Sequence, residues 1–429
     1  MKKSKGQPFF VYVPHTMPHT RLAATDQFKG KSKRGLYGDV IEEIDFNVGR
    51  ILDAVEEMGL SKNTYVLFTS DNGPWLIKNK NHQDGNLPGD HGGSAGPLRS
   101  GKVSTFEGGV RVPTVLWGPG RVPTNTTCDK IASTLDVLPT LASLAGAQVP
   151  KDRVIDGEDV THLFHGEFDQ ANPDKAFYYY LRVHLQAVRQ GKWKLHLPRE
   201  EKQLGTAPFL VNRHIAPVDR VGFQKPFLVD LDEDLGETTN IAEQHPDVVK
   251  KLLGLAQDMR NDLGDFDQVG KNMRFFDMRG QRPASPPVPQ VRDILRPKKS
   301  KKPQPTKVKP TAKRPNLIIF MLDDVGYGDV GCFGGKRAAT PHLDKMAAEG
   351  MRMTDFYVHP VCGVTRASLL TGSYAMRVAE VGNRKNGHPI LHPKEITIAE
   401  VMRDAGYRTG MVGKWHLAGS TRKEYPPEL

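Results

Sequence analysis

The sequence contains few cysteines, and its apolar runs are short. The three cysteines, Cys128, Cys332 and Cys362, exclude the disulfide framework of a small secreted scaffold. The first strand-like run, Phe9–Val13, ends at Pro14. A membrane-spanning helix needs roughly 18 apolar residues, and the run is also too short for a secretory leader. The sequence therefore predicts no membrane span and shows no signal peptide, which suggests the cytoplasm but leaves the compartment open.

Acidic residues are absent from residues 296–313, which contain eight basic residues and four prolines. A Lys/Pro tract cannot build a core and should be extended, so a linker is expected over residues 291–313. This tract supplies most of the net charge of +11, so the charge does not indicate a nucleic-acid partner. The remaining chain, within a total of 429 residues, is long enough for two or three folded domains.

Strand-like and helix-like segments alternate on both sides of the linker. Residues 35–58 and Ser133–Leu144 have helical patterns, and the latter has Ser133 as a cap and Gly146 as a stop. The pattern predicts an α/β fold with a mostly parallel sheet between helices. From about residue 175 it changes to turn-linked strands and a helix over residues 246–263, which predicts a smaller α+β subdomain. Continuous apolar runs typical of buried strands are Phe9–Val13, Thr64–Thr69 and Asn316–Leu322.

Acidic and amide side chains follow two of these predicted strands. Asp323 and Asp324 come directly after residues 316–322, and Asp71 and Asn72 follow residues 64–69. Sites in parallel sheets form at the carboxyl ends of strands. An oxygen-only ligand set suits Ca²⁺, or Mg²⁺, although each pair taken alone is more often a turn or a cap.

Other loops carry cations, histidines and a cysteine. Cys362 precedes Arg366 by four residues at the start of an apolar helix, so we expect a lowered thiol pKa and an anion held nearby. Each further residue taken alone is more often a surface cation or a structural histidine. Together they describe a site for a tetrahedral oxyanion ester. These further residues are His15, His19, Lys102, Arg111, Lys414 and His416.

These segments resemble type I, formylglycine-dependent sulfatases, most closely the arylsulfatase A-like enzymes. The resemblance lies in residues 8–19, 64–146, 187–253 and 314–419, including the motifs CGVTRASLLTG and GKWHLAG. It implies an alkaline-phosphatase-like α/β domain with a mixed, mostly parallel sheet and a small C-terminal-type α+β domain. It also implies hydrolysis of aryl or carbohydrate sulfates. A phosphate- or phosphonate-ester hydrolase of the same superfamily is the alternative.

The resemblance implies a cofactor pair. Ca²⁺, or alternatively Mg²⁺, would be held by Asp323, Asp324, Asp71 and Asn72. Cys362 would be converted to formylglycine by a formylglycine-generating enzyme, which would be a partner of this chain.

The resemblance also implies roles around the sulfate group. The hydrate of the converted Cys362 would be the nucleophile, and Arg366 would stabilise it. Lys414 and Lys102 would bind sulfate oxygens. His15 would protonate the leaving alcohol of a sulfated small molecule or saccharide. His416 would accept the proton of the other hydroxyl group of the hydrate.

The order of the segments departs from the family. Residues 1–165 match the late half of the catalytic domain, 166–290 the small subdomain and 314–429 the early half, so the halves are permuted around the linker. The family's middle segment is missing. A circular permutant with a deletion, a fusion of two truncated sulfatases and a mispredicted gene all fit this order.

The modification motif also departs from the family. Its pattern is Cys-x-Pro/Ala-x-Arg, and Val364 occupies the Pro/Ala position between Cys362 and Arg366. This change weakens the expected conversion of Cys362. A non-catalytic remnant that binds a metal or an anion is therefore a further alternative.

Overall fold

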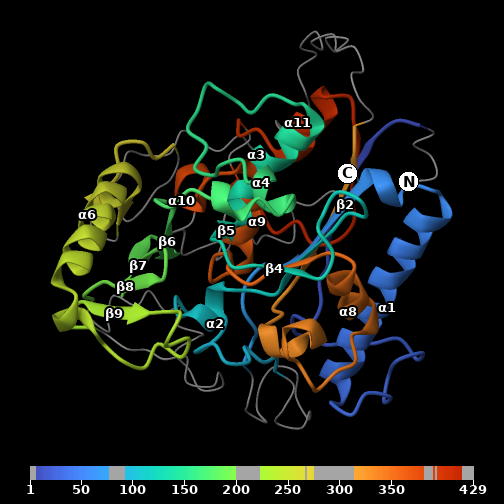
Figure 1. The fold of residues 1–429 in the computed structure, drawn as a ribbon, viewed down its shortest axis with the longest axis horizontal. Helices are drawn as coiled ribbons and strands as arrows, with labels where there is room; N and C mark the ends of the chain where they lie inside the picture. Colours follow the sequence, from blue (N-terminus) through green and yellow to red (C-terminus); the bar gives the residue numbers. More distant parts are fainter. Residues whose placement is uncertain are drawn as a thin grey trace.

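The computed structural model describes residues 6–76, 92–199, 223–265, 268–274, 314–380, 390–391 and 394–417. A seven-stranded sheet forms the centre of the molecule, with helices packed on both faces (Figure 1). In spatial order the strands are β17 (Arg408–Met411), β1 (Phe9–Pro14), β12 (Asn316–Leu322), β2 (Thr64–Ser70), β3 (Thr114–Trp117), β13 (Met351–Met353) and β4 (Thr126–Cys128).

Strands from the two ends of the chain interleave in this sheet. Strand β12 pairs in parallel with both β1 and β2, and β17 pairs in parallel with β1. Strand β3 runs antiparallel to β2 and β13, whereas β13 and β4 are parallel. The sheet is thus mixed and mostly parallel, which confirms the predicted fold class. The segments on either side of the predicted linker, which itself lies outside the described residues, build a single sheet.

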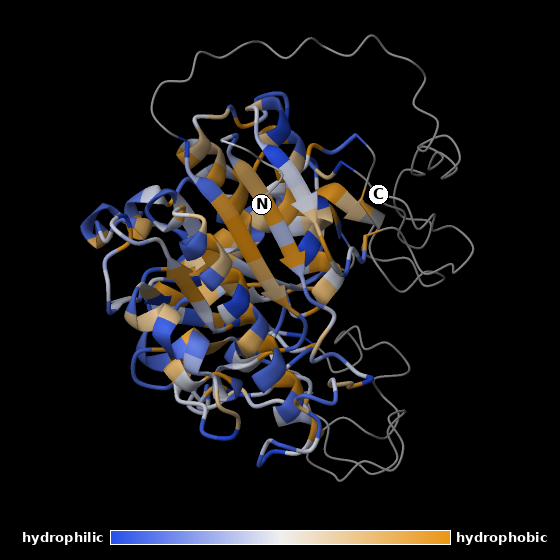
Figure 2. Ribbon diagram, turned by 90° about the vertical axis from the view of Figure 1, so that its right-hand side faces the viewer, coloured by the Kyte–Doolittle hydropathy of each residue, from blue (hydrophilic) through white to orange (hydrophobic). Residues whose placement is uncertain are grey.

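Alternation of side chains along the strands explains the two helical layers. Ile318 and Phe320 of β12 face a core that includes α1 and α8, while Leu317 and Ile319 face the core formed with α3, α9 and α11. Strands β2 and β12 are buried at every position, which is why they are continuous apolar runs (Figure 2). The helices on the sheet are α1 (Leu36–Glu57), α3 (Thr134–Ala145), α8 (Pro341–Ala348), α9 (Cys362–Thr371) and α11 (Ile398–Asp404).

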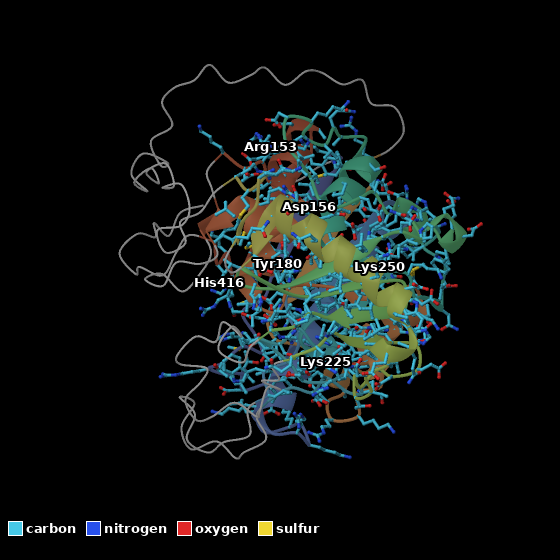
Figure 3. The ribbon with its side chains drawn as sticks, turned by 90° about the vertical axis from the view of Figure 1, so that its left-hand side faces the viewer. Arg153, Asp156, Tyr180, Lys225, Lys250 and His416 are labelled. Carbon is cyan, nitrogen blue, oxygen red and sulfur yellow. The ribbon has the colours of Figure 1, made fainter. Side chains whose placement is uncertain are left out.

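The smaller subdomain contains a four-stranded antiparallel sheet packed against α6 (Pro246–Leu263). Figure 3 looks onto α6, which carries Lys250; the hydroxyl of Tyr180 donates to Gly264 O at the end of this helix, over 2.9 Å. Residues 187–197 belong to a hairpin that turns at Gly191, where φ is 55°. The strands are β6 (Ala176–Leu181), β7 (His184–Gln190), β8 (Trp193–His196) and β9 (Phe227–Asp230).

Short elements complete the described part of the chain. The helices among them are α2 (Glu107–Val110), α4 (Thr161–Phe164) and α10 (Ala375–Val378). The 3₁₀ turns are η2 (Ser61–Asn63), η3 (Phe168–Gln170), η5 (Ala242–Gln244), η6 (Tyr327–Asp329) and η7 (Gly331–Phe333). Two-residue strands pair as β5 (Ala132–Ser133) with β14 (Phe356–Tyr357), β10 (Gly264–Asp265) with β11 (Gln268–Val269), and β15 (Ala379–Glu380) with β16 (Ile390–Leu391).

Capping residues explain why the sequence predicts where helices begin and end. Ser133 and Asp136 form a capping box at α3, and Gly146 ends that helix in the left-handed region. Thr397 and Glu400 form a second capping box, at α11. No helix in the described part of the chain has the length and apolar character needed to cross a membrane.

Candidate active site

The candidate site lies at the carboxyl ends of β1, β12 and β2. Backbone hydrogen bonds clamp together the loops that follow these strands. Asp71 N donates to Leu322 O over 3.0 Å, and His15 N donates to Met321 O over 2.8 Å. Asp323 N donates to Met17 O over 3.2 Å. Residues from both ends of the chain therefore meet at one edge of the sheet, where parallel sheets place their sites.

The two predicted acidic pairs converge there. Asn72 Nδ2 donates to Asp324 Oδ1 over 2.7 Å, and Asp324 N contacts Asp71 Oδ1 at 3.4 Å. All four side chains, including that of Asp323, are at most 1% exposed. Asp324 has a φ of 76°, a left-handed conformation that side chains rarely adopt and that is often found at functional sites.

Oxygen atoms in this cluster fit a hard cation. Three buried oxygens have no hydrogen-bond partner among the described residues: Asn72 Oδ1, Asp323 Oδ1 and Asp324 Oδ2. A buried acceptor without a partner carries a desolvation cost of about 1–3 kcal/mol, and a bound cation would remove it. Carboxylate and amide oxygens are the ligands that Ca²⁺ and Mg²⁺ prefer. The donor set therefore fits the cation that the sequence predicts.

Three cations each contact one of the aspartates through a single carboxylate oxygen. Lys102 Nζ lies 2.6 Å from Asp324 Oδ1, and Lys414 Nζ lies 2.6 Å from Asp323 Oδ2. The guanidinium of Arg366 donates twice to Asp71 Oδ2, over 2.9 and 2.6 Å.

These ion pairs separate the titration of two neighbouring carboxyl groups. Burial alone would raise the pKa of Asp323, but Lys414, Lys102 and Arg366 hold that pKa at about 2. Burial, followed by the negative charge of Asp323, raises the pKa of Asp71 to about 7 despite the contact with Arg366. Asp323 is consequently the carboxylate that stays ionised at every physiological pH.

Cys362 is the first residue of α9 and lies against this cluster. Its sulfur and the nearest carboxylate oxygens of Asp71 and Asp323 all lie within 4.8 Å of one another, and Lys414 Nζ is 3.8 Å from Sγ. The expected lowering of the thiol pKa is wrong. Burial raises the pKa of Cys362 to about 11, and the cations of Lys102 and Lys414 do not offset burial together with the two carboxylates. An unmodified Cys362 is thus a poor nucleophile at neutral pH.

The structure separates the two histidines that follow β1. A ring nitrogen of His19 lies within 4.8 Å of ligand oxygens of Asp323 and Asp324. The ring of His15 instead accepts a hydrogen bond from Met17 N over 3.0 Å, and burial lowers its pKa. The resemblance to the sulfatases assigned the protonating role to His15; both histidines follow the same strand, and the spacing alone does not distinguish them.

Trp75, which sequence reasoning missed, packs between two site residues. Its ring centroid is 6.1 Å from that of His19 and 4.9 Å from Lys102 Nζ. The only signal in the sequence is its position three residues after Asn72. The Trp75 ring thus contacts both the Lys102 ammonium and the ring of His19, whose Nδ1 is hydrogen-bonded to Thr20 O over 2.6 Å.

The remaining predicted residues are placed differently. His416 follows Lys414 by two residues, has a left-handed φ of 63° and is half-buried at the margin of the view in Figure 3. Arg111, which occurs in the same Gly-rich loop as Lys102, pairs instead with Asp355 at 2.9 Å. Val364 is 8% exposed and packs in the core on the α9 side of the sheet.

Comparison with protein families gives two matches. The sulfatase family model matches residues 1–147 and 315–428, which together make up more than half of the chain. The model of the C-terminal region of aryl-sulfatase matches residues 172–290. The match is therefore interrupted by the small subdomain and the predicted linker.

Curated relatives match parts of the chain. Mouse N-acetylgalactosamine-6-sulfatase is 41% identical over 195 residues, covering 45% of this chain and 35% of the mouse protein. Human steryl-sulfatase is 36% identical over 190 residues, covering 44% of this chain and 31% of the human protein. Bovine arylsulfatase A is 35% identical over 266 residues, covering 61% of this chain and 50% of the bovine protein. The chain thus spans a third to a half of the length of these relatives.

Among solved structures, one from a study of glycosaminoglycan metabolism by Bacteroides thetaiotaomicron is similar with a TM-score of 0.47 and 28% identity. The similarity covers 57% of this chain and 48% of that one.

Proposed function

We propose that this chain, which belongs to the sulfatase family, hydrolyses sulfate esters at the site formed by Asp71, Asp323, Asp324 and Cys362. The observation that carries the proposal is the arrangement of charges in this buried cluster. Each aspartate contacts one cation, and Asp323 and Asp324 each keep one carboxylate oxygen free of hydrogen bonds.

The charge balance of the cluster favours a divalent cation together with an anionic ligand. Three carboxylates are matched by the cations of Lys102, Lys414 and Arg366, so the empty cluster is nearly neutral. Adding Ca²⁺ alone would leave two uncompensated positive charges in a buried place, which is costly. A sulfate monoester carries one negative charge, and a second would develop on the attacking or leaving oxygen during sulfuryl transfer, so that neutrality would be restored as the reaction proceeds. The site is thus suited to stabilising charge on a transferring sulfuryl group.

The residues of this chain would divide the work as follows. Asp71, Asn72, Asp323 and Asp324 would hold Ca²⁺, which supplies Lewis-acid stabilisation of the sulfate oxygens when bound. Formylglycine made from Cys362 would supply the attacking oxygen.

Three cations would surround the sulfate group. Lys102 and Lys414 would move from their carboxylate partners toward sulfate oxygens. Arg366, held by Asp71, would keep the start of α9 electropositive.

Leaving-group protonation is better assigned to His19 than to His15. The ring of His19 lies beside Asp323 and Asp324, and its hydrogen bond with Thr20 O, over 2.6 Å, orients it. Burial and the bond from Met17 N tie His15 to its own turn. We keep His416, two residues after Lys414, as the proposed acceptor of the second proton.

The organisation of the chain belongs to the same proposal. Residues 1–165 and 314–429 would be the late and early halves of one catalytic domain in permuted order, with 166–290 as the small subdomain. What supports this is the interleaving of β1 and β2 with β12 and β17 in one sheet. The substrate would be a sulfated small molecule or saccharide, in keeping with the names of the relatives.

Assay of the protein produced together with a formylglycine-generating enzyme tests the proposal. Aryl sulfate and aryl phosphate esters are compared in Ca²⁺, with Cys362→Ala as the control. Turnover of the sulfate ester that Cys362→Ala abolishes is expected. Preference for the phosphate ester would favour the phosphatase alternative. A folded protein that contains formylglycine but turns over neither ester would make the chain a non-catalytic remnant.

A further inference from the structure

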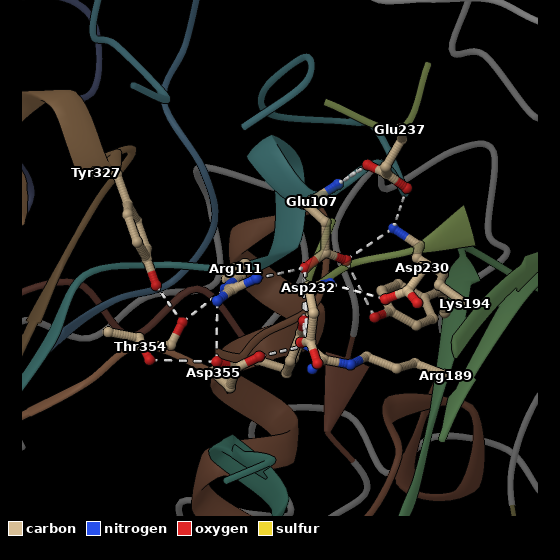
Figure 4. Close-up of polar contacts among 12 residues, drawn as sticks. Glu107, Arg111, Arg189, Lys194, Asp230, Asp232, Glu237, Tyr327, Thr354 and Asp355 are labelled. Atoms are coloured by element: carbon tan, nitrogen blue, oxygen red, sulfur yellow. Dashed lines mark hydrogen bonds and ion pairs between the residues drawn. The ribbon is translucent and has the colours of Figure 1, made fainter. Parts of the chain in front are cut away.

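A second cluster of buried charges lies outside the candidate site (Figure 4). Its centre is formed by Glu107 at the start of α2, Lys194 on β8 and Glu237 after β9, all fully buried. Lys194 Nζ lies 2.8 Å from Glu107 Oε1 and 2.7 Å from Glu237 Oε1. Glu107 N donates to Glu237 Oε2 over 2.6 Å. The small subdomain therefore contacts Glu107, at the start of α2, through both the backbone amide and the carboxylate of that residue.

The cluster also includes residues of the segment that precedes Cys362. Tyr357 donates to Glu107 Oε2 over 2.5 Å. Arg189 and Arg111 pair with the two oxygens of Asp355, at 2.6 and 2.9 Å. Burial by itself would raise the pKa of Glu107, but the charges of Lys194, Arg189 and Arg111 hold that pKa at about 2. Burial raises the pKa of Glu237 to about 7, so its carboxyl group is partly protonated at neutral pH. Residues of the small subdomain and of the segments before and after it thus meet in one buried polar network.

Stability alone does not explain such a network. Apolar residues of similar volume often stabilise a core as well as buried ion pairs do, because desolvation of the charges is costly. What an ion network adds is direction, since each hydrogen bond fixes the position of the group that it contacts. The network is therefore expected to fix the position of a group that it contacts.

Lys194 contacts the loop that carries Lys102, so this loop is the group whose position the network can fix. Lys194 Nζ donates to Thr105 O over 2.8 Å, three residues after Lys102. This loop is strained: Ser100 and Val103 have φ values of 66° and 69°. Left-handed backbone is unfavourable at such residues and persists only where the surroundings enforce it.

The other side of the loop is fastened to the candidate site. Lys102 N donates to Pro74 O over 2.9 Å, and Val103 N donates to Pro360 O over 2.8 Å. Pro74 follows the Asp71–Asn72 pair closely, and Pro360 precedes Cys362 by two residues. The loop is therefore a strained bridge between the metal ligands and the start of α9, and the small subdomain holds its far end.

We infer that Lys194 is a positioning residue: by holding Thr105 and Glu107, it keeps the strained loop in the conformation that directs Lys102 into the candidate site. The small subdomain is thereby required for sulfate binding, although its charged cluster lies outside the candidate site. This inference rests on the proposed function for the role of Lys102 as a sulfate ligand.

Three variants of the full-length protein test it. Lys194→Met removes the ammonium but leaves two buried carboxylates with one partner fewer. Lys194→Met/Glu237→Gln removes one charge of each sign, which avoids an uncompensated buried charge and keeps the protein foldable. The matched control is Lys192→Met, which changes an exposed lysine on the same hairpin.

Hydrogen–deuterium exchange over residues 98–106 gives a readout that does not depend on activity. We expect at least tenfold faster exchange in this segment in the paired variant, with exchange in β2 and β12 unchanged and with Lys192→Met like the wild type. Unchanged exchange over 98–106 in the folded paired variant overturns the inference.

A double-mutant cycle with Lys102→Ala gives the kinetic test. The paired variant should lower kcat/KM for an aryl sulfate at least tenfold in the wild-type background. It should have no further effect when Lys102 is already alanine, because Lys194 would act only through Lys102. Fully additive losses overturn the inference. If the wild type hydrolyses no sulfate ester, the proposed function fails, while the exchange comparison still decides whether Lys194 positions the loop.

Discussion

Arg366 donates two hydrogen bonds to one carboxylate oxygen of Asp71, although the two residues lie 295 positions apart in the chain. Both side chains are fully buried. Arg366 Nη1 also donates to Lys414 O over 2.9 Å, so this pair connects the ends of β2 and β17 with α9. It is a fully buried link between the two segments that build the candidate site.

Breaking this pair should strongly destabilise the protein. Above pH 7, where Asp71 is mostly ionised, Asp71→Asn leaves the Arg366 guanidinium buried without its countercharge, and we expect unfolding in urea at pH 8.5 to become easier by about 3–5 kcal/mol. The paired change Asp71→Asn/Arg366→Met should recover part of that loss. The exposed pair Arg403–Asp404 supplies the control, since Arg403→Met should cost at most about 1 kcal/mol. Equal effects at the two pairs would contradict the buried link.

Calcium should stabilise the protein through Asp324. Asp324→Asn keeps the left-handed backbone, which asparagine tolerates, but removes the charge that the cation needs. We expect Ca²⁺ to raise the Tm of the wild type and to have little effect on this variant. Asp53→Asn, at an exposed position of α1, should retain the full calcium shift. A wild type whose Tm ignores Ca²⁺ would show that the free oxygens do not form a cation site.

Acid stability should depend on His359. Its ring is buried, stacks near Phe177 and Tyr374, and has no partner for Nε2 among the described residues. Burial lowers the pKa of His359 to about 3, below the unfolded value near 6.5. The unfolded state therefore binds more protons between these values, so stability is complete above pH 6.5 and falls as pH decreases.

The substitution His359→Phe isolates this effect. It should reduce the loss of stability below pH 6.5 by about 1.4 kcal/mol per pH unit. Urea unfolding at pH 7.0 and 5.0 measures it. An identical pH dependence in wild type and variant would mean that the histidine is charged, or accessible, in the folded protein.

Leaving-group chemistry should distinguish His19 from His15. His19→Ala should lower kcat by about 10²–10⁴-fold for an alkyl sulfate, whose alcohol needs a proton, and far less for a nitrophenyl sulfate. His15→Ala should lower kcat for both esters by a similar factor, since its ring supports the local turn. The opposite pattern would return the protonating role to His15.

The parts of the fold that could be predicted are those with local causes. Strands β2 and β12 are buried on both faces, which makes them continuous apolar runs, and α3 begins at a capping box. Strand β13 has only three residues and pairs with β3 and β4 from the other segment, so no local pattern marks it.

The same distinction applies to the site. Asp71, Asn72, Asp323 and Asp324 follow readable strands, so their convergence could be predicted from the rule for parallel sheets. The raised pKa of Cys362 could not, because it depends on burial and on carboxylates from two distant loops. The network around Glu107 could not be predicted for the same reason, because its members come from three separate segments.

The most direct test of the central proposal is peptide mass spectrometry across residues 353–366, paired with an aryl sulfate assay of the same preparation. Wild type and Val364→Pro are each produced with a formylglycine-generating enzyme. We expect partial conversion of Cys362 in the wild type, more in Val364→Pro, and turnover in proportion to the converted fraction. Ordinary turnover by protein whose Cys362 is unmodified, or by Cys362→Ala, would contradict the proposed chemistry.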